Sequence, residues 1–379
     1  MTDIVKTLSS VQTPAYIADE ALLRQNLAAL KAVKDATGVQ IIYAIKACPL
    51  YPLFPIIAEV LDGSTASGPY EAKLGHDHFG KEVHVFCPAY AQSDIDQLLA
   101  IGGPIHFYFN SVHQLHKFEP QIRAASKDHA IGIRINPRIS VTKYEKYNPC
   151  RQGSHLGVPI DQLDTVPWDK VDILHAHALC ENMGADSALL IQTIAEKAAE
   201  YVRRVKYVNF GGGHFISHPD YHPLALIHAL NHFKAEFPSV QMLMEPGGAI
   251  VQGAGYIVAK VIETVEVDGV KTAILDASPN CHVPDVIKTD LQLPVVGGDE
   301  DTKNKPFVYT LAARTCMARD LWGTYGFEHD LKEGDTIVFK DGLQYSLGEA
   351  NWFNGHQRPS LGILRVDGNV EVFKSFGYK

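Results

Sequence analysis

Lys46 is the residue of this chain whose type and position best suit covalent chemistry. It follows an apolar run, 41–45, that predicts a β-strand. A lysine at the end of such a strand is partly desolvated, so its pKa falls and its amine can form a Schiff base with a carbonyl compound. A lysine that simply extends from a strand end into solvent is the plainer interpretation of this residue alone. The motifs further along the chain favour the first interpretation.

Two glycine-rich turns follow later apolar runs. One is Gly-Gly-Gly at 211–213, and the other is Glu-Pro-Gly-Gly at 245–248. Bare glycine backbone lets N–H groups approach an anion such as a phosphate, although a tight turn without a ligand has the same sequence. Glu245 would be a buried carboxylate beside that turn. Such a group needs a cationic partner, and a protonated pyridine nitrogen would serve.

His175 and His177 lie two residues apart on a predicted strand and therefore face the same way. This spacing suits a metal ion, and a metal-dependent barrel hydrolase is one hypothesis for the chain. However, no third or fourth ligand is evident near the pair in the sequence, and the pair is not on the first strand. We therefore expect no metal.

Apolar runs alternate with helical patterns through the first two thirds of the chain, as in 20–34, where apolar residues recur at helical spacing. The predicted strands are 41–45, 84–87, 106–109, 130–135, 173–178, 207–210 and 242–244. Repeated strand-helix units predict a parallel sheet, and seven or eight of them would close into a TIM-type (β/α)8 barrel with its chemistry at the carboxyl ends of the strands. We expect this barrel at residues 20–250.

Beyond residue 250 the pattern changes to β segments separated by Gly and Asp turns. The predicted segments are 251–267, 272–275, 307–311, 336–339 and 361–366. They predict a smaller β domain, a sandwich or barrel, made of residues 1–19 and 251–379. The polar stretch 296–306 predicts a mobile loop.

Composition excludes several classes of function. The chain has 379 residues, 46% apolar content and a net charge of −9, without the basic run of a nucleic-acid-binding protein. We find neither a signal-peptide core nor an apolar stretch of about 20 residues, so we expect no membrane association. Six scattered cysteines without a CxxC pair predict reduced thiols and a cytoplasmic location.

These motifs together resemble the fold-type III pyridoxal-phosphate decarboxylases, the group with an alanine racemase-like barrel that acts on ornithine, diaminopimelate and arginine. The matching segments occur in the family's order, and they are 43–47 (YAIKA), 67–71 (SGPYE), 134–137 (RINP), 175–177 (HAH), 211–213 (GGG), 245–247 (EPG), Cys316 and 352–359 (WFNGHQRP). Within that group the chain is similar to the carboxynorspermidine decarboxylases, in 61–75, in 180–182 (CEN) and in the spacing of Asp276, His282 and Asp285.

The resemblance implies a cofactor, pyridoxal 5′-phosphate, and a role for each residue around it. Lys46 would form the Schiff base, Glu245 would pair with the pyridine nitrogen, and His177 would stack on the ring. Arg134 and Glu71 would support the site. The phosphate and its surroundings would be held by Gly211, Gly212, Gly213, Gly247 and Tyr345.

The resemblance also implies a homodimer with shared active sites and a small cationic amino-acid substrate. Cys316 would come from the partner subunit and protonate the carbon that loses CO₂, while Asp276 would bind the distal amine of the substrate. The other substrate-binding residues would be Glu181, His282, Asp285 and Phe353.

Departures from the family pattern leave the substrate open. Gly248 stands where relatives carry a charged residue, and Met317 follows Cys316 where relatives acting on diaminopimelate place a carboxylate. We therefore expect decarboxylation of carboxynorspermidine or carboxyspermidine to norspermidine or spermidine, in polyamine biosynthesis. Another basic or siderophore-type amino acid, or a non-catalytic regulatory homologue, is the alternative. The chain length of the substrate and the roles of Gly248 and of 296–306 stay open.

Overall fold

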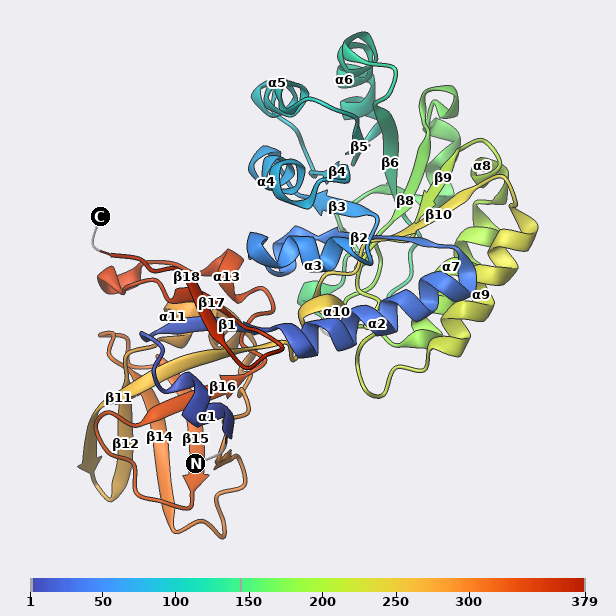
Figure 1. Ribbon diagram of the computed structural model, residues 1–379. Helices are drawn as coiled ribbons and strands as arrows, with labels where there is room; N and C mark the ends of the chain where they lie inside the picture. Colours follow the sequence, from blue (N-terminus) through green and yellow to red (C-terminus); the bar gives the residue numbers. More distant parts are fainter. Residues whose placement is uncertain (1–2, 144, 378–379) are drawn as a thin grey trace. The chain divides into compact units, whose positions relative to one another are not determined.

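The structure is a computed structural model that describes residues 3–143 and 145–377. The chain divides into two compact units, one made of residues 26–250 and the other of residues 1–25 and 251–379. We call them the barrel unit and the β unit and describe each by itself (Figure 1).

The barrel unit contains eight parallel strands that close on themselves, as expected from the repeated strand-helix pattern. The ring is closed where β10 pairs with β2 and where β5 pairs with β6. In ring order the strands are β2 (Gln40–Ala44), β3 (Gly63–Ala66), β4 (Glu82–Phe86), β5 (Ile105–Phe109), β6 (Ala130–Asn136), β8 (Ile173–Ala176), β9 (Tyr207–Asn209) and β10 (Gln241–Met244). A two-residue strand, β7 (Val158–Pro159), pairs with β6 outside the ring.

Helices connect successive strands on the outside of the barrel (Figure 1). They are α2 (Glu20–Thr37), α3 (Phe54–Ala58), α4 (Pro69–Phe79), α5 (Gln92–Ile101), α6 (Val112–Ala125), α7 (Gly184–Lys197), α8 (Ala199–Val202), α9 (Pro223–Glu236) and α10 (Gly248–Val251). Local sequence explains several of their ends. Helix α6 begins after Ser111, whose hydroxyl accepts the N–H of Gln114, and α4 ends at Gly80 in the left-handed conformation.

The β unit is one curled mixed sheet of nine strands. The strands are β1 (Ala15–Asp19), β11 (Gly255–Val267), β12 (Val270–Leu275), β13 (Gly298–Asp299), β14 (Phe307–Ala313), β15 (Leu321–Phe327), β16 (Thr336–Lys340), β17 (Ser360–Leu364) and β18 (Val370–Lys374). The first half of the long strand β11 pairs with β1 and β16, and its second half pairs with β12. Three short helices, α11 (Pro279–His282), α12 (Pro284–Thr289) and α13 (Ser346–Glu349), lie in its connections.

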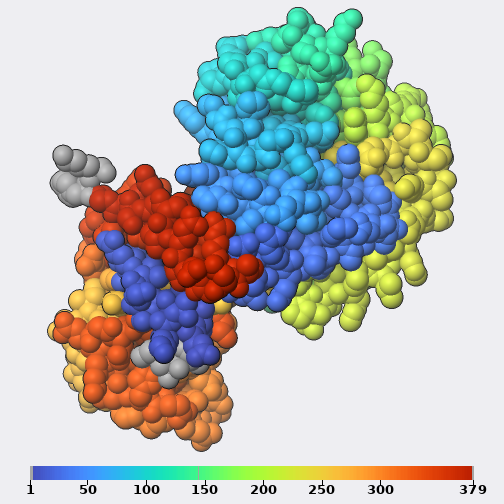
Figure 2. All heavy atoms as spheres, in the orientation of Figure 1, coloured from blue at the N-terminus to red at the C-terminus, as the bar shows by residue number. Residues whose placement is uncertain are grey.

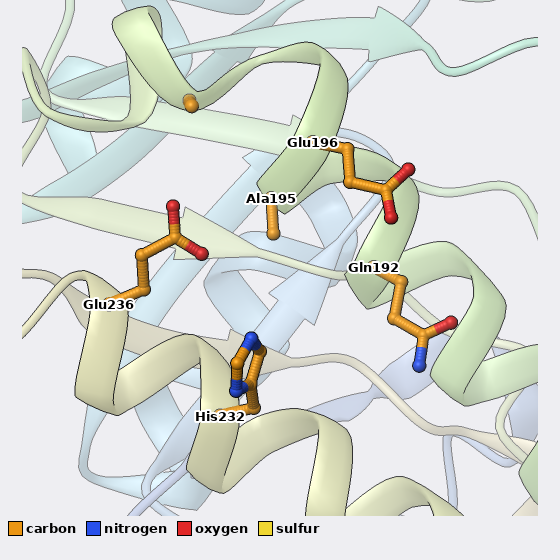
Figure 3. Close-up of a pocket in the computed structure, with 6 residues that line it drawn as sticks. Gln192, Ala195, Glu196, His232 and Glu236 are labelled. Carbon is orange, nitrogen blue, oxygen red and sulfur yellow. The ribbon is translucent and has the colours of Figure 1, made fainter.

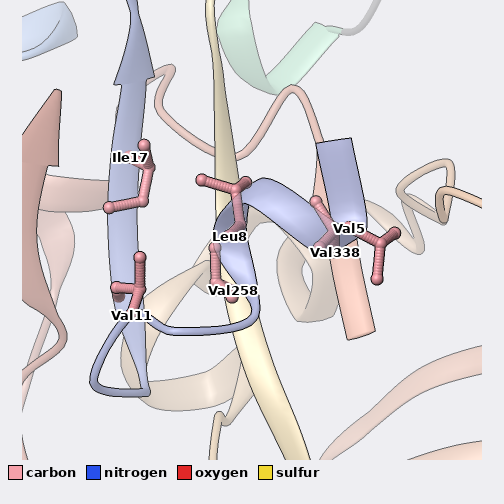
Figure 4. Packing of buried hydrophobic residues seen from close by; sticks show 7 residues of the cluster. Val5, Leu8, Val11, Ile17, Val258 and Val338 are labelled. Carbon is pink, nitrogen blue, oxygen red and sulfur yellow. The ribbon is translucent and has the colours of Figure 1, made fainter. Parts of the chain in front are cut away.

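The N-terminal segment completes the β unit although most of that unit lies beyond residue 250. Strand β1 runs antiparallel to β11 and parallel to β17, so it joins two strands from the other end of the chain. In the space-filling view its dark blue atoms lie among the orange and red atoms of the same unit (Figure 2). Apolar side chains of helix α1 (Asp3–Leu8) and of the residues that follow it pack against β11 and β16. The residues of this cluster include Val5, Leu8, Val11, Ile17, Val258 and Val338 (Figure 4).

The structure corrects two expectations for the β unit. Segment 296–306 is not a structureless loop, because it contains β13, which pairs with β15, and the N–H of Val296 donates to Val338 at 2.9 Å. Val251 ends helix α10, and the strand expected from that residue begins only at Gly255.

We expect that Leu8→Ala destabilises the β unit by about 2–5 kcal/mol, because Leu8 is fully buried in the cluster of Figure 4 and its removal leaves a cavity. Leu291→Ala is the control, since that side chain is 46% exposed in the same unit and should change the free energy of unfolding by less than about 0.5 kcal/mol. Urea denaturation followed by tryptophan fluorescence measures both. Equal effects of the two substitutions would contradict the packing role of α1.

Candidate active site

Lys46 lies in a short 3₁₀ turn, Ile45–Ala47, directly after β2. Two hydrogen bonds hold this turn: the N–H of Cys48 donates to Ile45 at 3.0 Å, and the hydroxyl of Tyr43 donates to the carbonyl of Cys48 at 2.8 Å. A Cβ on Gly247 would lie 2.9 Å from the Cβ of Ala47, so only glycine lets the 245–247 loop pack against this turn. The sequence thereby brings the ends of β2 and β10 together.

The surroundings of Lys46 prepare its amine for reaction. Desolvation within the barrel lowers the pKa of Lys46 from its ordinary value; Glu245 opposes that shift and Arg134 adds to it. The side chain nevertheless keeps surface open to solvent. Protein therefore surrounds most sides of the Lys46 side chain, and a small molecule can still reach its exposed surface.

Glu245 is a buried carboxylate at the end of β10. Its Oε1 accepts a hydrogen bond from the amide of Asn209 at 2.8 Å, and its Oε2 lies 3.4 Å from Nε2 of His175. Burial alone would raise the pKa of Glu245, but His175, His84 and Asn209 lower it to about 2. Burial in turn lowers the pKa of His175, so we assign a neutral imidazole beside an ionised carboxylate. A cationic ligand group is the partner that this carboxylate lacks.

A chain of hydrogen bonds supports Glu245 from inside the barrel. The amide nitrogen of Asn209 also donates to the hydroxyl of Tyr108 at 3.0 Å, and this hydroxyl lies 2.7 Å from Nδ1 of His84. Tyr108, Asn209 and His84 are buried. These residues were not predicted from the sequence; the one available signal for Asn209 is its position at the end of a strand, two residues before the Gly-Gly-Gly turn.

His177 and Arg134 lie beside each other at the ends of β8 and β6. The guanidinium of Arg134 donates to the carbonyl of His177 at 3.0 Å and lies over the ring of Phe86, 4.6 Å from its centroid. Desolvation lowers the pKa of His177 well below its usual value, so its ring is neutral. Its Nδ1 accepts the N–H of Gly212 at 3.2 Å, which fixes the ring and places the proton on Nε2.

The Gly-Gly-Gly turn requires glycine because other backbone lies against it. A Cβ on Gly212 would lie 2.6 Å from the carbonyl of Glu245, and a Cβ on Gly213 would lie 2.2 Å from the carbonyl of Leu179. The N–H groups of Gly211 and Gly212 donate to Asn209 and His177, so they are engaged within the protein. The N–H of Gly213 has no acceptor among the residues that the structure describes.

His175, His177 and Glu245 have potential ligand atoms within 4.8 Å of one another. The expectation that no third metal ligand accompanies the histidine pair is therefore corrected, because strand β10 brings Glu245 beside them. The residues fit pyridoxal phosphate as a set: an amine of lowered pKa for its aldehyde, a buried carboxylate for its ring nitrogen, and a backbone N–H for its phosphate. A zinc ion would use the carboxylate but leave Lys46 without a function.

Cys316 is an exposed residue of the β unit, held by ordered neighbours. Its N–H donates to the side-chain oxygen of Asn354 at 3.0 Å. Asp320, which is buried, accepts hydrogen bonds from the hydroxyls of Ser278 and Thr315 and thereby closes the loop that carries Cys316. The predicted site residues did not include Asn354 or Asp320, although Asn354 lies in the segment 352–359 that resembles the family.

Two of the residues expected to bind the substrate have hydrogen-bond partners within the β unit. Asp276 uses both carboxylate oxygens within the β unit: one accepts from Thr13 at 2.5 Å and the other from the N–H of Lys260 at 2.8 Å. His282 is fully buried, and both of its ring nitrogens are bonded, to the N–H of Ser278 and to the carbonyl of Gln357. His282 therefore shapes its turn and has no ring nitrogen left for a substrate.

The remaining predicted residues lie in both units. Tyr345 precedes α13 and has φ of 60°, a strained value for an aromatic residue, and Glu181 in the barrel unit has φ of 54°. Asp285 lies in the first turn of α12. Phe353 is exposed in a short turn of the β unit.

A second hollow lies elsewhere on the barrel unit. It is formed by residues of α7, α9 and the start of α8, and Gln192, Glu196, His232 and Glu236 line it (Figure 3). These helices are on the outside of the barrel, and this lining lacks the lysine, carboxylate and glycine turn found at the strand ends. We therefore place the active site at the strand ends.

Comparisons with known proteins agree with this geometry. Residues 15–342 match the family described as pyridoxal-dependent decarboxylase, C-terminal sheet domain. A carboxynorspermidine/carboxyspermidine decarboxylase of Campylobacter jejuni is 33% identical over 97% of both chains, and a carboxyaminopropylagmatine decarboxylase of Synechocystis is 33% identical over 98% of this chain and 95% of that one.

A solved structure gives the same result. The crystal structure of carboxynorspermidine decarboxylase from Campylobacter jejuni, in complex with norspermidine, superposes with a TM-score of 0.88 at 31% identity, covering 97% of this chain and 98% of that one. None of the helices in the described part of the chain is long and apolar enough to cross a membrane. With its barrel, its strand-end lysine and carboxylate and its matching relatives, this chain belongs to the family of pyridoxal-dependent decarboxylases.

Proposed function

We propose that the protein uses pyridoxal 5′-phosphate to decarboxylate a carboxylated polyamine, carboxynorspermidine or carboxyspermidine, giving norspermidine or spermidine. The observation that carries the proposal is the buried, ionised Glu245 beside Lys46, because this pair provides the carboxylate and the amine that the cofactor requires. The names of the similar relatives support the substrate class.

Within this proposal the residues of the barrel unit bind and orient the cofactor. When bound, pyridoxal phosphate supplies an electron sink for the pair of electrons left behind by CO₂. Lys46 would hold the cofactor through Nζ, and Glu245 would keep a proton on its ring nitrogen. His177 would contact the ring with its neutral imidazole, and Gly213 and Gly247 would hold the phosphate. Gly211 and Gly212 have no Cβ, so their backbone can lie against His177 and Glu245.

Apart from Glu181 of the barrel unit, the groups proposed to act on the substrate belong to the β unit. Cys316 holds at Sγ the proton that replaces CO₂ on the α-carbon. We infer a homodimer in which the Cys316 loop of one chain serves the barrel of its partner, and the exposure of Cys316 together with Trp352 and Phe353 supports this inference. Asp276, Asp285 and Glu181 are the carboxylates proposed to meet the amines of the substrate.

A second substrate is supported by a specific finding. The carboxyaminopropylagmatine decarboxylase of Synechocystis is as similar in identity as the carboxynorspermidine enzyme of Campylobacter jejuni. Agmatine derivatives end in a guanidinium group, and polyamines end in an ammonium group. Acidic side chains bind either cation, so a comparison of decarboxylation rates is needed to identify the substrate.

We expect the purified protein to be yellow and Lys46→Ala to lose the visible absorbance that borohydride reduction bleaches in the wild type. The physical reason is that Lys46 has a lowered pKa and is the amine that holds the cofactor. Lys73→Ala is the matched control, because Lys73 forms an exposed ion pair with Asp77 and should keep the colour. A wild-type protein that stays colourless with added cofactor would overturn the proposed function.

Complementation tests the shared site. Lys46→Ala and Cys316→Ala should each be inactive, and a mixture that exchanges subunits should recover about a quarter of wild-type activity, since half of the dimers then carry one intact site. A mixture of Lys46→Ala and Glu245→Gln should stay inactive, because both changes lie in the same barrel. A fully active monomer in analytical ultracentrifugation would exclude the shared site.

For the substrate, we expect kcat/KM for CO₂ release from carboxynorspermidine to exceed that for diaminopimelate or ornithine by roughly 30-fold or more, the equivalent of about 2 kcal/mol for one mispaired charged group. Carboxyspermidine and carboxyaminopropylagmatine complete the panel, and a preference for the latter assigns the second substrate.

Asp276→Asn should lower kcat/KM for the preferred substrate without changing the cofactor absorbance. Asp330→Asn, at an exposed carboxylate of the same unit that pairs with Lys271, is the control. A silent Asp276→Asn would show that this carboxylate serves only Thr13 and Lys260.

A further inference from the structure

A second group of potential metal ligands lies at the opposite ends of the barrel strands from Lys46. Glu82 is the first residue of β4, His84 follows two residues later on the same face, and His106 lies near the start of β5. His84 and His106 are direct neighbours in the register of the two strands. Because strands β4 and β5 are parallel, these three side chains gather at their amino ends, on strands visible in Figure 1.

The distances within this group match a metal site. Nε2 of His84 lies 3.4 Å from Oε2 of Glu82, and ligand atoms of all three residues lie within 4.8 Å of one another. Ligands at about 2.0–2.2 Å from a tetrahedral zinc ion are about 3.3–3.6 Å apart. One pair of ligand atoms therefore already has the required separation, and a ligand atom of His106 lies within 4.8 Å of both.

The bonding of the two imidazoles gives a second, independent indication. Nδ1 of His106 is buried and has no hydrogen-bond partner among the described residues, which is costly for a polar atom unless a ligand occupies it. Nδ1 of His84 lies 2.7 Å from the hydroxyl of Tyr108. Metal-binding histidines typically donate their other ring N–H to such a partner, which orients the ring.

We propose that Glu82, His84 and His106 bind a divalent transition metal of the zinc class at the amino end of the barrel. Two imidazoles and one carboxylate are a ligand set that zinc accepts, and the exposed side of Glu82 leaves a fourth position to water. Binding places the lone pair of His84 at Nε2, so its ring proton lies on Nδ1 and is donated to Tyr108. The metal joins β4 to β5.

His84 is linked to Glu245 through Tyr108 and Asn209, but none of the three proposed ligands is proposed to contact the cofactor or the substrate. Because the test measures bound zinc, its outcome is independent of the proposed function. Wild-type protein saturated with pyridoxal phosphate is stripped with a chelator, incubated with ZnCl₂ and passed through a desalting column, and zinc per chain is measured by atomic absorption. We expect close to one zinc ion per chain and a higher thermal unfolding midpoint with zinc than without it. Titration with ZnCl₂ gives the dissociation constant.

Glu82→Gln keeps the size of an exposed side chain and removes its charge, so it should weaken zinc binding at least about tenfold, as loss of a direct ligand exceeds the usual effect of a supporting residue. His106→Ala should abolish retention. Asp77→Asn is the control, because Asp77 and His76 form an exposed pair on α4 that a weakly bound ion could use, and it should bind zinc like the wild type. Two outcomes would overturn the proposal. One is failure of the wild type to retain zinc. The other is equal retention by Glu82→Gln and the wild type, which would assign the ion to another group, such as His175, His177 and Glu245.

Discussion

The ionised carboxylate of Glu245 is the constraint on which the barrel unit depends. A buried carboxylate is stable only when its oxygens accept hydrogen bonds and a cation balances its charge. Asn209 donates to one oxygen, Nε2 of the neutral His175 lies 3.4 Å from the other, and Tyr108 behind Asn209 extends this support towards His84. None of these groups is a cation; Lys46 and Arg134 are the cations that interact with Glu245, and the proposed cofactor would add the charge of its protonated ring nitrogen.

The Gly-Gly-Gly turn is needed because its backbone lies against the groups around Glu245. Gly211 and Gly212 place their backbone against His177 and Glu245, where a Cβ would overlap protein atoms, and their N–H groups fix Asn209 and His177. The turn thus positions the carboxylate and the histidine as much as it exposes N–H groups. Substitution of either glycine would displace the groups around the cofactor even without a direct loss of phosphate contacts.

Much of the fold could be predicted from the sequence, because buried parallel strands are continuous apolar runs. The eight-stranded ring and the strand-end positions of Lys46 and Glu245 followed from that pattern. Strand β3 (Gly63–Ala66) was missed, because its small polar residues lack an apolar run. The polar chain through Tyr108 and Asn209 was missed as well, since it joins residues about 100 positions apart that only barrel closure brings together.

The β unit shows that residue identity alone does not give a side chain's bonding partners. His282 has the type of a substrate ligand, yet both of its nitrogens are bonded within its own unit, and Asp276 is bonded likewise. Asp320 and Asn354, by contrast, hold the backbone around an exposed cysteine. Ordering a loop costs conformational entropy, and a buried carboxylate costs desolvation. The packing of the β unit does not require Cys316 at that exposed position, and the order around it supports the proposed role of its thiol in the reaction.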